Sequence, residues 1–112
     1  MKLISAIIKP FKLNRVREAL CNIGVQGMTV TDLKGTGRQK GHADLDRGAG
    51  YANNFLPKVK IDIATQDSSV EQVVDVIRQT AQTGKLGDGN LIIFEVGAAV
   101  RIRTGEANTD AI

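Results

Sequence analysis

Lys58–Ala64, with the sequence KVKIDIA, indicates the fold of the chain because apolar and polar residues alternate along it. In an extended strand, successive side chains point to opposite faces. The apolar set is Val59, Ile61 and Ile63, and the polar set is Lys58, Lys60 and Asp62. The stretch therefore predicts a strand with one apolar face that another layer of the protein must cover.

Helical patterns lie on both sides of this strand. After it, Ser69 begins the sequence SVEQ, in which Gln72 completes a capping-box pattern. Apolar residues then recur at helical spacing, as they also do earlier, where the pattern stops at Gly24. The two apolar sets are Val70, Val73, Val74, Ile77 and Ala81, and Leu13, Val16, Ala19, Leu20 and Ile23. The sequence predicts two amphipathic helices.

Further segments have the composition of strands. LISAIIK from Leu3 to Lys9 and LIIFEVG from Leu91 are apolar, and alternation predicts a strand from Met28 to Lys34. AAVRIR, which ends at Arg103, is interpreted as a short final strand. Two βαβ units separated by a long loop commonly form one antiparallel sheet with both helices on one face. We expect this α+β, ferredoxin-like βαββαβ sandwich as a single domain over residues 1–112.

Composition narrows the classes of protein. With 42% hydrophobic and 24% charged residues, the chain resembles an ordinary globular protein, and its net charge of +3 does not demand a nucleic-acid partner. Cys21 is the single cysteine, which favours a reducing compartment, and its place in a helix favours a packed thiol. No apolar stretch approaches membrane-spanning length, so we expect a cytoplasmic protein. The strands from Leu3 and Leu91 are apolar on both faces, which predicts a homo-oligomer.

Three elements rich in glycine or basic residues suggest phosphate recognition. GTGRQKG follows the second strand, TGKLGDGN precedes the strand at Leu91, and RIR places Arg101 and Arg103 on one side of an extended segment. Each has a plainer interpretation as a surface insertion, a tight turn or a charged sheet edge. Together they make binding of a polyphosphate the best joint explanation, although a Walker A loop is absent.

Catalysis has little support in the sequence. His42, Asp44 and Asp46 all fall in the long loop, where solvated side chains are the more common interpretation. We therefore predict no catalytic residue and a ligand-responsive binding protein rather than an enzyme. A small phosphate-ester enzyme that uses Asp44 or Asp46 is the competing hypothesis from another class.

The blocks AIIKPFKL, VREAL, GRQKGH, NFLPKVKID, TGKLGDG and RIRTGE resemble the PII family of nitrogen-regulatory signal-transduction proteins, in order and spacing, over nearly the whole chain. The resemblance implies a ferredoxin-like homotrimer with nucleotide sites between neighbouring subunits. It implies a T-loop at residues 37–55, which changes conformation with bound ligands, and a flexible tail at 104–112. It also implies regulation of nitrogen metabolism through the T-loop, with an ammonium transporter, a nucleotidyltransferase or another regulator as protein partner.

The resemblance also implies which residues bind small molecules. ATP and ADP would compete for one site, and Mg²⁺ with ATP would create the site for the effector 2-oxoglutarate. Gly27, Met28, Thr29 and Ala64 would surround the adenosine. Gly35, Gly37, Arg38, Gln39, Gly87, Asp88, Gly89 and Asn90 would meet the phosphates, and Arg101 and Arg103 would come from the adjacent subunit. Gln39, Lys40, Gly41 and Lys58 would hold 2-oxoglutarate, with Gln39 also completing the Mg²⁺ shell, and Tyr51 would be the uridylylated residue.

Several residues depart from the pattern of the family. Asn90 stands where lysine is usual, Thr36 where phenylalanine is usual, Asp46 where tyrosine is common and Gly50 where glutamate is usual. Asn90 removes a positive charge at the phosphates, and the other changes alter the T-loop. The alternative is therefore a divergent PII-like adaptor that binds adenine nucleotides but regulates another transporter or process, with an altered or absent response to 2-oxoglutarate.

Overall fold

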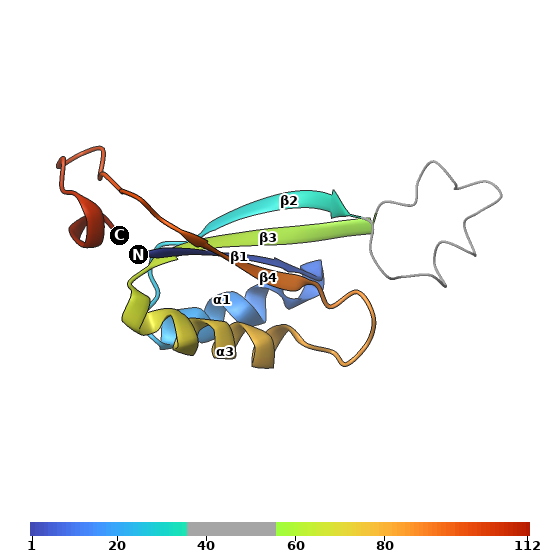
Figure 1. Ribbon diagram of the computed structural model, residues 1–112. Helices are drawn as coiled ribbons and strands as arrows, with labels where there is room; N and C mark the ends of the chain where they lie inside the picture. Colours follow the sequence, from blue (N-terminus) through green and yellow to red (C-terminus); the bar gives the residue numbers. More distant parts are fainter. Residues whose placement is uncertain (36–55) are drawn as a thin grey trace.

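The computed structural model describes residues 1–35 and 56–112 as a sheet with a helical layer on one side (Figure 1). The strands are β1 (Lys2–Ile8), β2 (Thr29–Gly35), β3 (Leu56–Thr65) and β4 (Asn90–Glu95), and the helices are α1 (Leu13–Asn22) and α3 (Val70–Ala81). Single turns of 3-10 helix occupy Pro10–Lys12, Asp67–Ser69 and Asn108–Ala111. The strand order is β2-β3-β1-β4 and every neighbouring pair is antiparallel. The α+β, ferredoxin-like prediction is confirmed.

The core lies between the sheet and the two helices. The alternation that predicted β3 is confirmed, because Val59, Ile61 and Ile63 are all buried. Ala6 of β1 pairs with Ile61 of β3, so both side chains face the same layer. Helices and strands contribute together to the buried cluster, which comprises Ile4, Ala6, Ile8, Val16, Leu20, Val59, Ile61, Ile63, Val73, Ile77 and Ala81.

The first helix ends where the sequence predicted, but its cysteine is not buried as predicted. Gly24 has a φ of +91°, and the following Val25 amide donates to the Leu20 carbonyl at 3.0 Å, which closes the helix in a left-handed cap. Cys21 is exposed, so the prediction of a packed thiol is wrong. Helical spacing places Cys21 one position beyond Leu20, and the buried stripe is narrow enough to leave it outside.

Two other local predictions are also wrong. Ser69 does not cap α3 with its side chain, because it already has helical dihedral angles and its amide donates to the Gln66 carbonyl at 3.0 Å. AAVRIR does not form a strand. The chain reverses at Gly105, which has a φ of +73°, and leaves one isolated bridge between Val100 and Ala107. The tail folds back in this turn and a 3-10 helix, and its flexibility stays a prediction.

The open face of the sheet is apolar beside β1 and β4. Leu3 pairs with Phe94 and Ser5 with Ile92, so these side chains share the face opposite the helices. Ile92 is 43% exposed and Phe94 is 48% exposed in the single chain. Residues 36–55 connect Gly35 to Leu56, which are register partners, so this segment leaves and re-enters the sheet at one end. The predicted T-loop itself lies outside the described residues.

The backbone before β4 approaches β1 unusually closely. Gly89 has a φ of +95°, and a Cβ atom there would lie 1.7 Å from the carbonyl oxygen of Ile7. The adjacent pair Ile7 and Asn90 begins the β1–β4 register. Only glycine therefore lets this loop enter the sheet at this place.

Replacement of Gly89 by alanine should lower the free energy of unfolding by about 2–5 kcal/mol, from left-handed strain and the forced separation of β1 from the loop. Gly84→Ala is the matched control for strain alone, since Gly84 has a φ of +81° and open space around it. Gly97→Ala, with neither feature, should be nearly neutral. Chemical denaturation of the three variants checks this order. Equal losses for Gly89→Ala and Gly84→Ala would contradict the close approach.

Candidate functional site

The described residues of the predicted site form two groups at opposite ends of the sheet. Gly27, Met28, Thr29, Ala64 and Arg101 belong to the first group, and Gly35, Lys58, Gly87, Asp88, Gly89 and Asn90 to the second. Lys58 and Ala64 both lie on β3, and six residues of extended chain separate them by about 20 Å. One chain does not bring the two groups together.

The first group lines a cleft of about 930 Å³. The loop between α1 and β2 supplies Gly27 and Met28, the end of β3 supplies Ala64, and the C-terminal segment adds Arg101 and Ile112. Figure 1 shows this end of the molecule, where the C-terminal arm returns beside the N-terminus. The lining mixes apolar side chains with Gln66, Ser69 and Gln72, a composition that suits an organic ligand with polar edges.

Arg101 is held in this cleft by its own C-terminal turn. Its guanidinium lies 3.7 Å from the Glu106 carboxylate and donates to the Asp110 carbonyl at 3.4 Å. Arg103 lies two residues farther along, in an exposed turn rather than on the same face of a strand. Arg101 therefore lines the same cleft as Gly27 and Ala64 of its own chain. The expectation that Arg101 and Arg103 come from the adjacent subunit stays a prediction.

The second group centres on the loop between α3 and β4, residues 82–89. Gly84, Gly87 and Gly89 all have positive φ values, between +81° and +95°. Such a backbone can turn sharply and present its amide groups without side-chain obstruction, as anion-binding loops do. Gly35 reaches the same region from β2, where an added Cβ would lie 3.7 Å from Cγ of Lys58.

Asp88 organises this loop from within. Its carboxylate accepts hydrogen bonds from the Thr83 amide at 2.7 Å, the Thr83 hydroxyl at 2.5 Å and the Gly84 amide at 3.0 Å. Lys9 completes the shell, with Nζ 3.2 Å from Oδ1. Partial burial raises the pKa of Asp88, but the bonds from Thr83, Lys9 and Gly84 outweigh it and hold the pKa well below its usual range. The carboxylate is thus committed to internal partners.

Lys58 ties the loop to β3. Its ammonium group donates to the Gly87 carbonyl at 2.5 Å, and the residue is only 8% exposed. Burial, together with the nearby charge of Lys9, lowers the pKa of Lys58, and Asp88 opposes the shift. The negative charge of a carboxylate ligand would offset both unfavourable contributions.

Asn90 occupies the first position of β4 and is exposed. It lines a small cavity of about 160 Å³ together with Asp88, Gly89 and apolar residues of α3. An amide at this place offers a donor and an acceptor but no positive charge. The prediction that the phosphate-binding residues have one positive charge fewer than is usual in the family rests on Asn90.

Other predicted residues lie outside the described ranges. They are Thr36, Gly37, Arg38, Gln39, Lys40, Gly41, His42, Asp44, Asp46, Gly50 and Tyr51. Within residues 1–35 and 56–112, no three His, Cys, Asp or Glu side chains gather as a metal centre would require. Within the same ranges, no helix is both long enough and apolar enough to span a membrane.

Sequence reasoning missed Lys9 and Thr83. Lys9 marks the end of a strand in the sequence, and nothing there connects it with a loop more than seventy residues away. Thr83 donates to Asp88 and accepts from Lys9 at 3.1 Å. The available signal was the spacing from Thr83 to Asp88, which resembles a loop closed by its own carboxylate.

Asp88→Asn should lower the free energy of unfolding by about 1–3 kcal/mol at pH 7, the usual range for hydrogen bonds to a charged group. Because the folded-state pKa of Asp88 is lowered, its contribution is present above the unfolded pKa of about 4 and is lost as the pH falls below that value. Denaturation from pH 7 to 2 should show the difference between the two proteins shrinking. Asp75→Asn, an exposed change of equal charge on α3, should cost less at pH 7. A pH-independent difference for Asp88→Asn would contradict the assignment.

Comparison with known proteins identifies the family. The sequence model described as Nitrogen regulatory protein P-II matches residues 1–106. Nitrogen regulatory protein GlnK of Escherichia coli is 58% identical over 112 residues, covering all of both chains. Nitrogen regulatory protein P-II of Bradyrhizobium diazoefficiens is 59% identical, and Nitrogen regulatory protein P-II 1 of Escherichia coli is 60% identical, each over the full length of both chains. The chain belongs to the P-II family of nitrogen regulatory signal-transduction proteins.

Proposed function

We propose that this P-II protein binds ATP or ADP at the seam between two subunits of a homotrimer and reports the bound state to protein partners. The separation of the two residue groups within one chain is the observation that carries this proposal. Since the phosphates of a nucleotide follow directly after its adenosine, one ligand cannot use the cleft and the distant loop of the same chain. A neighbouring subunit must bring its loop to the cleft.

This arrangement revises the partition expected from the sequence. The cleft residues Gly27, Ala64 and Arg101 would come from one subunit, and Gly87, Asn90 and Gly35 from the next. Arg101 then brings positive charge toward phosphates held by the neighbour's loop. We place Arg103 on the same side as Arg101 because they share one short turn.

The apolar open face supports assembly. Leu3, Ile7, Ile92 and Phe94 lie on that face beside the β4 edge, and partly exposed apolar side chains gathered on one sheet are typical of an oligomer contact. The trimer is typical of the family. Its formation would bury this face and bring cleft and loop together.

Mg²⁺ and 2-oxoglutarate are proposed as metal and effector. The site suits a carboxylate because Lys58 is buried and, among the residues that the structure describes, its hydrogen-bond partner is a carbonyl rather than a carboxylate. Lys58 would pair with the distal carboxylate of the effector, while Gln39, Lys40 and Gly41 would complete the site. Mg²⁺ supplies positive charge that the ATP phosphates and a 2-oxo acid can share.

The T-loop is the proposed output. Gly35 and Leu56 flank it and belong to the same end of the sheet as Lys58, so ligand contacts at that end can bias the segment between them. The proposed partners are an ammonium transporter, a nucleotidyltransferase that modifies Tyr51, or another nitrogen regulator. The chain would act on them by binding and not by catalysis.

Asn90 favours a second candidate. Because Asn90 and not lysine begins β4, the residues proposed to bind the phosphates carry less positive charge than the family pattern provides. A divergent adaptor that binds adenine nucleotides but regulates another process, with a weaker 2-oxoglutarate response, is the alternative.

Calorimetric titration with ATP and ADP, each with Mg²⁺, with and without 2-oxoglutarate, tests the proposal. We expect both nucleotides to bind, and 2-oxoglutarate to bind only when Mg²⁺ and ATP are present. Asn90→Lys should tighten ATP binding about ten-fold, the scale of one added charge-assisted contact. Nucleotide binding that never admits 2-oxoglutarate, in either protein, would favour the adaptor, and no nucleotide binding would refute both.

A further inference from the structure

We infer that Lys9 is a positioning residue of the loop at 82–89, where it neutralises Asp88 and anchors the loop to the end of β1. Naming this loop as the phosphate-binding element rests on the proposed function. The anchoring itself rests on contacts within the described chain.

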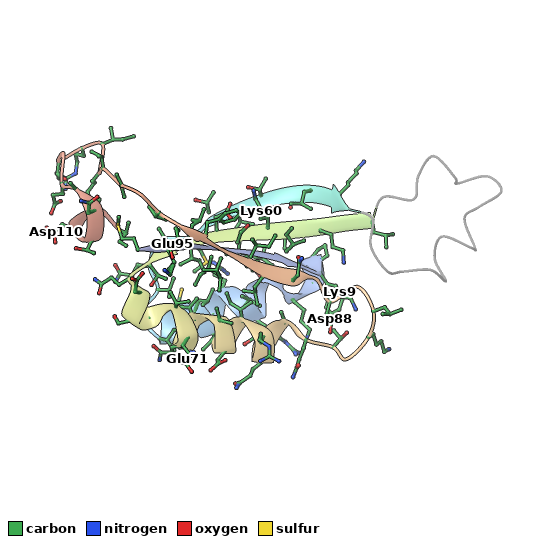
Figure 2. The ribbon with its side chains drawn as sticks, viewed as in Figure 1. Lys9, Lys60, Glu71, Asp88, Glu95 and Asp110 are labelled. Atoms are coloured by element: carbon green, nitrogen blue, oxygen red, sulfur yellow. The ribbon has the colours of Figure 1, made fainter. Side chains whose placement is uncertain are left out.

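Lys9 reaches the loop from a fixed base. It directly follows β1, one of the two central strands, whose last residue Ile8 is buried. Its side chain is 18% exposed, and Nζ contacts the Thr83 hydroxyl at 3.1 Å and the Asp88 carboxylate at 3.2 Å. Figure 2 shows Lys9 and Asp88 side by side beside the loop that leads into β4. The ammonium group therefore joins both ends of the loop to the sheet.

The positive charge of Lys9 also compensates the negative charge of Asp88. A carboxylate inside an anion-binding loop would repel the ligand unless a cation compensates it. Asp88 is needed in the loop because it accepts from the Thr83 and Gly84 amides. Lys9 supplies the compensating charge at Oδ1, whereas the Thr83 and Gly84 amides donate to Oδ2. The lowered pKa of Asp88 agrees with a carboxylate that stays charged under this protection.

Within residues 1–35 and 56–112, Lys9 and Lys58 both hold the loop. Lys58 donates to the Gly87 carbonyl, near the tip. If Lys58 donates to a ligand carboxylate instead of the Gly87 carbonyl, the hydrogen bond from Lys58 to the loop is lost. The loop must still present its amide groups to the phosphates. The Lys9 anchor is independent of Gly87, so it can keep the loop in place during the exchange.

Amide hydrogen exchange on the full chain tests the anchor without any ligand. In Lys9→Met, the Thr83 and Gly84 amides should exchange about ten-fold faster, the scale of one lost charge-assisted contact, while amides of β1 and β3 keep their rates. Lys12→Met is the control, since the Lys12 side chain has no hydrogen bond or ion pair with the residues that the structure describes. Unchanged Thr83 and Gly84 rates, or equal acceleration across the sheet, would overturn the inference. Lys9→Gln serves if Lys9→Met does not fold.

A double variant asks whether Lys9 acts through Asp88. Asp88→Asn alone should already release the Thr83 and Gly84 amides, and adding Lys9→Met should change their exchange little further. Fully additive acceleration would place the action of Lys9 elsewhere and overturn the inference.

Binding of ATP and of adenosine provides the functional readout. Lys9→Met should weaken ATP about ten-fold and leave adenosine unchanged, because adenosine does not use the loop. Equal weakening of both ligands would count against a positioning role. If the unmodified protein binds neither ligand, the proposed function fails, while the exchange rates still decide the role of Lys9.

Discussion

The length of an extended strand is the constraint on which the site depends. β3 runs through the sheet from Leu56 to Thr65, and its antiparallel pairing with β1 and β2 fixes it in place. Such a strand cannot shorten to bring Lys58 toward Ala64, which lie about 20 Å apart. The cleft and the glycine-rich loop are therefore separate features of each chain. In the proposed function, assembly would make one site from them and would link nucleotide binding to the oligomer.

The loop before β4 has a firmly held base and one contact, from Lys58, that a ligand could replace. Gly89 passes against Ile7 where no other residue fits, and Asp88 satisfies the backbone within the turn. Lys58, by contrast, holds the loop through a hydrogen bond to the Gly87 carbonyl. A carboxylate ligand competes well for a buried ammonium group, since charge-assisted bonds are stronger than bonds to neutral acceptors. In the proposed function, binding of a carboxylate effector would therefore alter the tip of the loop and leave its base in place.

Local patterns in the sequence predicted most of the fold. The alternation from Lys58 to Ile63 and the apolar composition of β1 reflect burial in the core. The apolar residues of β4 are mostly exposed in the single chain. The capping box at Ser69 was predicted wrongly because Ser69 already belongs to the 3-10 turn that precedes α3. A four-residue sequence pattern does not show such a turn. Cys21 was placed on the wrong side of a narrow helical stripe.

The site was predictable only in part. Its glycines and arginines carry a local signature, and the resemblance to a family assigns them ligands. The grouping of Arg101 with the cleft depends on a turn at Gly105 that reverses the chain, and the role of Lys9 depends on contacts across the fold. Both are tertiary features that spacing along the chain does not encode.

The most direct measurement is ATP binding to mixed trimers of two separately defective chains. Ala64→Trp would fill the cleft, and Asn90→Asp would place a negative charge at the phosphate loop without changing side-chain shape. Each variant alone should bind ATP poorly. After the two are unfolded together and reassembled, a mixed trimer should recover binding at the seam that joins an intact cleft to an intact loop. Failure of mixed trimers to regain any binding would contradict a site shared between subunits.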